Sequence, residues 1–299
     1  MEKNGEWFNI PIPVEWEQLT VYHVLSKEIG ASKAMISKWN QASMINRNNE
    51  RTDVNHKLQK GDILQLQLFK QEDYGVVPEN LPLDVLFEDP HLLIVNKQPG
   101  IDTHPNSPNQ TGTLANAVAY HFQANGLQTK VRHIHRLDKD TSGALIFAKH
   151  DLAHSLLDTA LEQRKIKRTY VAIVEGRMNK HQGVINSPIG KDRHHATRRR
   201  VSPTGQKAIT HYQVEHYKSD KNLTVLSLQL ETGRTHQIRV HLSSIGHPII
   251  GDTLYGGSKK YIDRQALHAV QIQLTHPITK EEIVAKATYP SDVEKLLNS

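Results

Sequence analysis

The sequence "RHIHRLDKDTSG", residues 132–143, is the most informative stretch of the chain, and the apolar segment "ALIFAKH", residues 144–150, follows it directly. An apolar run of this length bounded by polar residues predicts a buried β-strand. Two basic side chains and a carboxylate fall in the four positions from His135 to Asp138. A carboxylate beside cations and next to a buried strand is either an ion-paired structural group or a reactive one.

Three interpretations of Asp138 follow from the residues alone. The spacing of Asp138 and Asp140 imitates the start of a calcium loop, but Lys149 stands at the twelfth position, where such a loop needs a glutamate. His133 and His135 could be a pair of metal ligands, although no third ligand lies at the spacing of a metal motif. Alternatively, Asp138 could act on a substrate as a nucleophile or base, with the neighbouring cations favouring its charged form.

Composition limits the class of protein. The chain has 299 residues, of which 37% are hydrophobic and 23% charged, an ordinary globular mixture. The absence of cysteine excludes disulfides, thiol nucleophiles and thiolate-bound zinc or iron–sulfur sites. No run approaches the ~20 apolar residues that cross a bilayer, and the start, "MEKNGEWFNI", lacks the apolar core of a secretory signal. We therefore expect a cytoplasmic protein without a membrane partner.

Positive charge is concentrated in one part of the chain. Residues 161–210 carry 12 Lys and Arg against 3 Asp and Glu, a local balance of +9, whereas the whole chain has +6. Residues 1–75 carry 9 against 10, a balance of −1. A local field of +9 suits a polyanion, and nucleic acid is the usual candidate. A solvated basic surface is the alternative, and the run alone does not decide between them.

Residues 1–72 are predicted to form a small separate module. Apolar residues recur at helical spacing from Leu19 to Ile29, and Ser32 offers an N-cap for a second short helix. In the segment 64–68, leucines alternate with Gln65 and Gln67, as in a half-buried strand. This order resembles a small α/β RNA-binding module, the S4 domain. Because phosphate-binding surfaces are normally basic, the balance of −1 predicts feeble RNA binding or a docking role.

Residues 73–84, which lie in a polar segment with two prolines, are predicted to be a linker to a larger domain over residues 85–299. Helices are expected over 113–123 and 152–164. Strands are expected in "LDVLFED", "HLLIVNK", "ALIFAKH", "TYVAIVEG", "AITHYQVEHY" and "LTVLSLQLET". The order shows no βαβ repeat. We therefore predict an α+β fold with a mixed, mainly antiparallel sheet.

Four motifs occur in order over roughly residues 85–290. They are "NKQPG" at 96–100 with His104-Pro105, "HRLDKDTSG" at 135–143, "KRTYVA" at 167–172, and "TGRTHQIR" at 232–239 followed by "VHLSSIGHPIIGDTLYG". Together they resemble the RluA family of RNA pseudouridine synthases. The resemblance implies that family's fold, with a central cleft across a mixed sheet and Asp138 in a loop at the floor of the cleft.

The resemblance also implies roles for the matched residues. Asp138 falls at the position of the family's essential aspartate, which acts at C1′ of uridine, and Tyr170 at the tyrosine that stacks on the target base. Arg234 matches the arginine that pairs with the aspartate, and Arg136 a residue that fills the stack left by the flipped base. The motifs add further candidates for substrate binding, namely His135, Asn96, Lys97, His104, Lys167, Arg168 and Arg239.

The predicted activity is the isomerisation of specific uridines in structured RNA, breaking N1–C1′ and forming C5–C1′. The reaction needs no redox change or phosphate energy, so we expect no cofactor and no metal, and the sequence has neither a Walker A motif nor a GxGxxG fingerprint. Ribosomal RNA is favoured over transfer RNA, and a monomer is the default. Two rivals remain, a non-catalytic RNA-binding protein and a metal-dependent hydrolase built on the histidines with Asp138 and Asp140.

Overall fold

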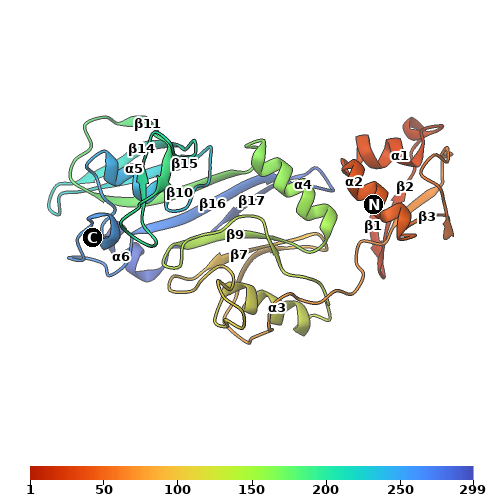
Figure 1. Ribbon diagram of the computed structural model, residues 1–299, viewed down its shortest axis with the longest axis horizontal. Coiled ribbons are helices and arrows are strands. Elements are labelled where there is room, and N and C mark those ends of the chain that lie inside the picture. The colour runs from red at the N-terminus through yellow and green to blue at the C-terminus, as the bar shows by residue number, and fades with distance from the viewer. Residues whose placement is uncertain (299) are drawn as a thin grey trace.

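A ten-stranded sheet forms the centre of the fold in the computed structural model, which describes residues 1–298 (Figure 1). The strand order is β11-β14-β15-β10-β16-β9-β7-β6, with β17 beside β16 and β8 beside β9. All pairs are antiparallel except β16 with β9. The strands are β6 (Asp84–Glu88), β7 (Leu92–Lys97), β8 (Arg132–His133), β9 (Ser142–Ala148), β10 (Lys167–Glu175), β11 (Gln182–Asn186), β14 (Ile209–Lys218), β15 (Leu223–Leu230), β16 (Leu267–Thr275) and β17 (Glu282–Lys286). The predicted mixed, mainly antiparallel sheet is confirmed.

Helices cover both faces of the sheet. Because side chains alternate along a strand, Leu93 and Leu145 pack with α3 (Leu114–Ala124), whereas Ile94 and Ile146 pack in the cluster that contains residues of α4 (Asp151–Glu162). Both predicted helices are present, shifted by one or two residues. Thr113 caps α3 in a capping box, as its place before the apolar run indicates. Two shorter helices, α5 (Gln237–Ser244) and α6 (Ser291–Asn298), follow β15 and β17.

The N-terminal part has its own sheet and core, shown in red at one end of the molecule in Figure 1. The sheet order is β1-β2-β5-β3-β4, with strands β1 (Glu2–Asn4), β2 (Trp7–Pro11), β3 (Ile45–Arg47), β4 (Glu50–Arg51) and β5 (Ile63–Leu66). Ser32 caps α2 (Lys33–Gln41), as predicted. The helix expected over 19–29 is instead a short α1 (Val21–His23) that continues as a π-turn over Val24–Glu28.

One expectation for this sheet is wrong. The alternation of a half-buried strand places Gln65 on the face opposite the leucines, which would be open to solvent, yet only 6% of Gln65 is exposed. Its amide nitrogen donates to Asn9 Oδ1 (3.0 Å), and its Oε1 accepts the backbone N–H of Asn49 (2.8 Å). The central strand of a five-stranded sheet is covered by its neighbours on both sides, and these hydrogen bonds satisfy the buried amide.

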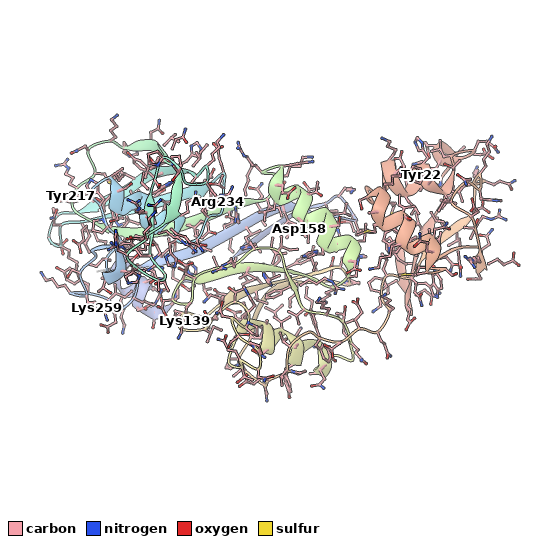
Figure 2. All side chains as sticks on the ribbon, in the orientation of Figure 1. Tyr22, Lys139, Asp158, Tyr217, Arg234 and Lys259 are labelled. Carbon is pink, nitrogen blue, oxygen red and sulfur yellow. The ribbon has the colours of Figure 1, made fainter. Side chains whose placement is uncertain are left out.

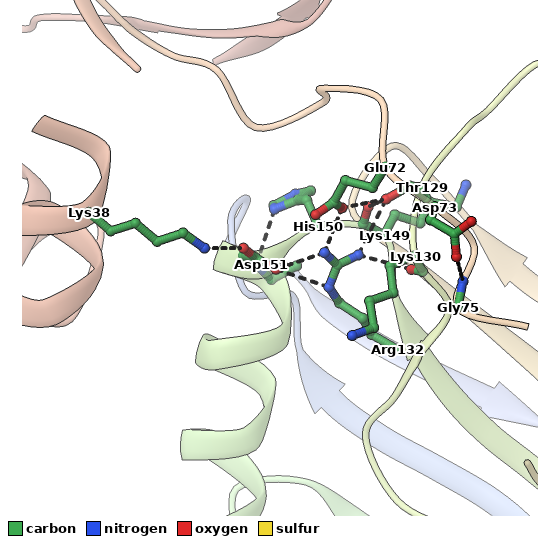
Figure 3. A network of polar contacts seen from close by, with 11 residues as sticks. Lys38, Glu72, Asp73, Gly75, Thr129, Lys130, Arg132, Lys149, His150 and Asp151 are labelled. Atoms are coloured by element: carbon green, nitrogen blue, oxygen red, sulfur yellow. Dashed lines mark hydrogen bonds and ion pairs between the residues drawn. The ribbon is translucent and has the colours of Figure 1, made fainter. Parts of the chain in front are cut away.

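The N-terminal part packs against the end of α4 and the edge of the large sheet. Phe69 contacts the ring of His150 (5.2 Å between centroids), and Lys38 Nζ lies 3.4 Å from the carboxylate of Asp151 (Figure 3). Arg132 bridges Asp151 (2.7 Å) and Glu72 (2.6 Å), which begins the connection to the large sheet. Residues 73–83, the predicted linker, form neither helix nor strand, and hydrogen bonds connect them to the α3 region.

Candidate active site

A cavity of about 630 Å³ opens between the loop that precedes β9 and the turn that joins β15 to α5. Its lining includes Asp138, Tyr170 and Arg234, so the structure brings together the three residues expected to be catalytic. A smaller cavity of about 190 Å³ is lined by further residues of the same loop, among them Lys139 and Asp140. Asp138 lines both cavities.

The loop that carries Asp138 is held by hydrogen bonds at its two sides. The hydroxyl of Thr103 donates to the carbonyl of Leu137 (3.0 Å), and the backbone N–H of Thr141 donates to the carbonyl of Asp138 (3.0 Å). The side chain of Asp138 keeps 19% of its surface exposed. A turn fixed in this way presents the carboxylate to the cavity without burying it completely.

Arg239, on α5, is the partner of Asp138. Its Nη1 donates to Asp138 Oδ2 at 3.0 Å, while its Nε and Nη2 form a fork with Asp252 at 2.7 and 2.9 Å. Burial opposes the charge of Arg239, but the hydrogen bonds and the charge of Asp252 outweigh it and raise the pKa of the guanidinium. A bidentate pair of this geometry fixes the guanidinium in position. Arg239 is therefore held so that its remaining nitrogen faces Asp138.

The expectation that Arg234 pairs with Asp138 is wrong. The exposed Arg234 side chain donates through Nε to the carbonyl of Lys207 (3.1 Å) at the rim of the cavity. Figure 2 labels Arg234 at the height of the central strands and Lys139, the neighbour of Asp138, below them. Arg234 precedes α5, whereas Arg239 lies within the first turn of this helix. The helical backbone directs the side chain of Arg239 toward Asp138. The motif contains two arginines, and sequence alone does not show which one faces the carboxylate.

Asn96 and Lys97 do not reach the cavity as substrate ligands. The fully buried Lys97 donates through Nζ to the carbonyls of Gln98 (3.0 Å), Ile101 (2.8 Å) and Lys139 (2.7 Å). Burial lowers the pKa of Lys97 to about 7. Asn96, also buried, donates to Asp84 and Thr288. Both residues lie at the end of β7. Through its hydrogen bond to the carbonyl of Lys139, Lys97 supports the loop that carries Asp138.

Tyr170 lies on β10 where the pairing of that strand with β16 shifts register between Thr169 and Tyr170. The side chain is almost completely buried, and burial raises the pKa of its hydroxyl. The ring forms part of the cavity wall. Arg168, two residues earlier on the same face, also lines the cavity and is buried. The strand therefore supplies an aromatic face and a cation to one wall.

Comparisons with known proteins identify the chain. A family model described as RNA pseudouridylate synthase matches residues 91–244, which is more than half of the 299 residues. The chain belongs to the RNA pseudouridylate synthase family. A second model, described as the RluD ribosomal pseudouridine synthase N-terminal domain, matches residues 8–64 of this synthase. The predicted membership of the RluA family, with an S4-like N-terminal domain, is confirmed.

Curated relatives and a solved structure agree with this assignment. The "uncharacterized RNA pseudouridine synthase YhcT" of Bacillus subtilis is 52% identical over 296 residues, covering 99% of this chain and 98% of the relative. The ribosomal large subunit pseudouridine synthase D of Haemophilus influenzae is 37% identical over 287 residues, covering 90% and 86%. The structure of human RNA pseudouridylate synthase domain containing 1 superposes with a TM-score of 0.58 at 26% identity, covering 71% of this chain and 85% of that one. The synthase is an isomerase that forms pseudouridine in RNA.

The other expected ligands of the synthase lie in different places. His135 lines the large cavity, is buried, and has no hydrogen-bond partner for either ring nitrogen among residues 1–298; burial lowers its pKa far below the usual value. Arg136 is exposed and lines both cavities. His104 lines the smaller cavity and stacks on His133, with 4.6 Å between ring centroids. Lys167 is exposed at the start of β10 and lines neither cavity.

Three residues of the site received no role from the sequence. Asp252 holds Arg239, and His236 lies with its Nε2 3.9 Å from Asp138 Oδ2. Tyr255 contacts His236 from the short helical turn over Thr253–Tyr255. Asp252 and Tyr255 belong to "GDTLYG", which was part of the resemblance. A buried acid and a tyrosine in a turn are too common for their residue types alone to identify them.

The described part of the chain comprises residues 1–298. Within that range, no group of three or more histidine, aspartate or glutamate side chains is placed so that it could hold a metal ion. Within the same residues, no helix is both long enough and apolar enough to cross a membrane.

Proposed function

We propose that this synthase converts uridines of large-subunit ribosomal RNA into pseudouridine, with Asp138 acting at C1′ of the target nucleotide. The observation that carries the proposal is that Asp138 lines both cavities while its carboxylate lies 3.0 Å from the guanidinium of Arg239. The name of the Haemophilus influenzae relative supports the choice of large-subunit RNA. An enzyme with this substrate works in the cytoplasm, and we propose that it does so as a monomer.

The chemistry explains the need for a carboxylate. The N1–C1′ bond breaks, the freed uracil turns within the site, and a bond forms between C5 and C1′ before the C5 proton is lost and N1 regains one. The atoms balance without an added reactant. C1′ gains cationic character when the bond to N1 breaks, and the carboxylate of Asp138 opposes this charge. Arg239 balances the negative charge of the carboxylate before the nucleotide enters.

The base has to leave its stack to reach Asp138, as in other enzymes that act on nucleobases. The aromatic face of Tyr170 in the cavity wall suits stacking, which contributes about 1–3 kcal/mol per base. His135 offers two buried ring nitrogens that have no hydrogen-bond partner among residues 1–298, one a donor and one an acceptor in the neutral ring. We propose that Tyr170 holds the ring of the base and that His135 hydrogen-bonds to the nucleotide.

Residues 161–210, with their local charge balance of +9, supply affinity for the RNA backbone. Strands β12 (Ile189–Lys191) and β13 (Arg199–Val201) form a separate hairpin whose loop contains Arg193 and Arg198. Tyr255 bonds to the backbone of Arg199, so the hairpin lies beside the site. We propose that this hairpin and Arg136 contact phosphates next to the flipped nucleotide. The N-terminal part, with its balance of −1, orients the enzyme and binds RNA weakly.

Mapping pseudouridines in ribosomal and transfer RNA from cells with and without the gene tests the substrate directly. We expect one or a few pseudouridines of large-subunit RNA to disappear with the gene and to return when it is restored on a plasmid. A gene for the Asp138→Asn variant serves as the control and should not restore them. Loss of sites confined to transfer RNA would contradict the choice of ribosomal RNA.

A further inference from the structure

We propose that His236 and Tyr255 form a positioning pair for Asp138, in which Tyr255 fixes the tautomer of His236 so that an imidazole N–H faces the carboxylate. The inference rests on the proposed role of Asp138 at C1′. It gives a role to His236 and Tyr255, neither of which takes part in the ion pair between Arg239 and Asp138. Both act through Asp138 and are therefore positioning residues.

Three contacts in series carry the inference. The backbone N–H of Arg199 donates to Tyr255 Oη at 2.8 Å, and Tyr255 Oη lies 2.9 Å from His236 Nδ1. The other ring nitrogen, His236 Nε2, lies 3.9 Å from Asp138 Oδ2. Tyr255 Oη has no further hydrogen-bond partner in residues 1–298. The series links the basic hairpin, the turn after α5 and the Asp138 loop.

The hydrogen positions follow from counting donors. Tyr255 carries a single hydroxyl hydrogen, and because its oxygen already accepts from Arg199, that hydrogen is free for His236 Nδ1. Burial lowers the pKa of His236, whose side chain is only 14% exposed, so the ring carries one proton at neutral pH. With Nδ1 accepting from Tyr255, that proton resides on Nε2. Nε2 is the nitrogen that faces Asp138.

The backbone of His236 supports a positioning role. His236 occupies the N-cap of α5 in the left-handed conformation, with φ of 56°, and its side chain makes no capping hydrogen bond. A non-glycine residue in this region is uncommon, and its backbone is strained there. Ser, Thr, Asp or Asn would normally stand at the N-cap and satisfy a backbone N–H. Here the ring faces Tyr255 and the Asp138 carboxylate instead.

The distance to Asp138 defines what the pair does during the reaction. At 3.9 Å the N–H and the carboxylate attract each other without a hydrogen bond, which needs about 1 Å less. Contacts of this kind are often long before substrate binds and shorten in the complex. We therefore expect the pair to affect the chemical step and to leave RNA affinity unchanged.

The first test measures the tautomer without RNA and without turnover. Protein labelled with 15N-histidine gives ring nitrogen shifts that distinguish Nε2–H from Nδ1–H, and the resonance absent from His236→Asn identifies His236. We expect Nε2–H in the parent protein, and a mixture or the Nδ1–H form in Tyr255→Phe. A parent spectrum with the Nδ1–H form would overturn the proposal, because Nε2 would then present a lone pair to Asp138.

The second test compares matched variants by single-turnover rate at saturating RNA and by the Kd for RNA. Tyr255→Phe should slow the chemical step by roughly two- to tenfold with an unchanged Kd, the size expected for the loss of one hydrogen bond between neutral groups. Tyr261→Phe is the control, because its hydroxyl has no hydrogen bond in residues 1–298. His236→Gln, whose amide nitrogen can reach the place of Nε2, should keep most of the rate that His236→Asn loses.

The outcomes separate this inference from the proposed function. Equal rates for His236→Gln, His236→Asn and the parent would overturn the positioning pair and leave Asp138 in place. Full turnover by Asp138→Asn would overturn the proposed function whatever the tautomer of His236. A Tyr255→Phe variant that lost RNA affinity and thermal stability together would show a structural role and also overturn the pair.

Discussion

Replacement of Arg239 by methionine should remove both stability and activity, whereas replacement of Arg234 by alanine should remove little of either. Methionine keeps much of the length of the arginine side chain and none of its charge. The change leaves the carboxylates of Asp138 and Asp252 without their guanidinium. Leaving Asp252 unpaired costs more free energy of unfolding than leaving Asp138 unpaired, because the side chain of Asp252 is only 1% exposed.

The magnitudes follow from these contacts. Removing one partner of a buried ion pair costs about 3–5 kcal/mol, because an unpaired charge stays in the interior. Loss of the hydrogen bond to Asp138 costs about 1.5–3 kcal/mol where it supports the reacting carboxylate, or roughly ten- to a hundredfold in rate. Arg234 is exposed and has one hydrogen bond to a carbonyl, so Arg234→Ala should change the free energy of unfolding by about 0.5 kcal/mol or less.

Urea unfolding and single-turnover pseudouridine formation measure the two effects. In the Arg239→Met background, Asp252→Asn should recover part of the lost free energy of unfolding, because it removes the unpaired charge. The reasoning is refuted if Arg234→Ala abolishes chemistry in a folded protein while Arg239→Met leaves it intact. That result would assign the partner of Asp138 to the arginine that the sequence motif suggested.

Three further outcomes are expected. Alanine at Arg198, Arg199 and Arg200 should weaken RNA binding and reduce the slope of log K against log salt by between about one and three units, since fewer counterions are released; an unchanged slope would place the RNA track elsewhere. A truncated chain that starts at Gln71 keeps the Glu72–Arg132 ion pair, so it should melt at a higher temperature than one that starts at Leu81. Both truncated chains should still modify RNA, with poorer affinity than the full chain. Complete inactivity of a folded truncated chain would give the N-terminal part a place in the active site. Burial lowers the pKa of His91, His133 and His268 from 6.5 to about 4. Below pH 6.5 the unfolded chain therefore binds more protons than the folded protein, and stability falls towards pH 4. Equal melting temperatures at pH 7.5 and 4.5 would contradict this expectation.

Local patterns predicted those parts of the molecule that depend on neighbouring residues. Alternating and continuous apolar runs located the main strands, and Ser32 marked the first turn of α2. The apolar run after Asp138 forms β9, as its pattern predicts, where a calcium loop would be followed by an exit helix. In these cases the information lies within a few residues of the element.

Long-range geometry was not available to the same reasoning. Lys97 matched a motif of the site, yet its Nζ turns to three carbonyls under the loop, one of them 42 residues away. The choice between Arg234 and Arg239 depends on where α5 begins, and Asp252 gains its role only because the chain returns to α5. Each of these assignments needs the distance between segments that are far apart in sequence.

The most direct test of the central claim replaces Asp138 by asparagine and follows tritium release from RNA that carries C5-labelled uridine. Asparagine keeps the size of the side chain and removes its negative charge, so we expect release to stop while the melting temperature and the Kd for RNA stay close to the parent values. Asp140→Asn is the matched control, two residues away in the same loop, and should keep its turnover. Substantial tritium release by folded Asp138→Asn would contradict the assignment of Asp138 as the group that acts at C1′.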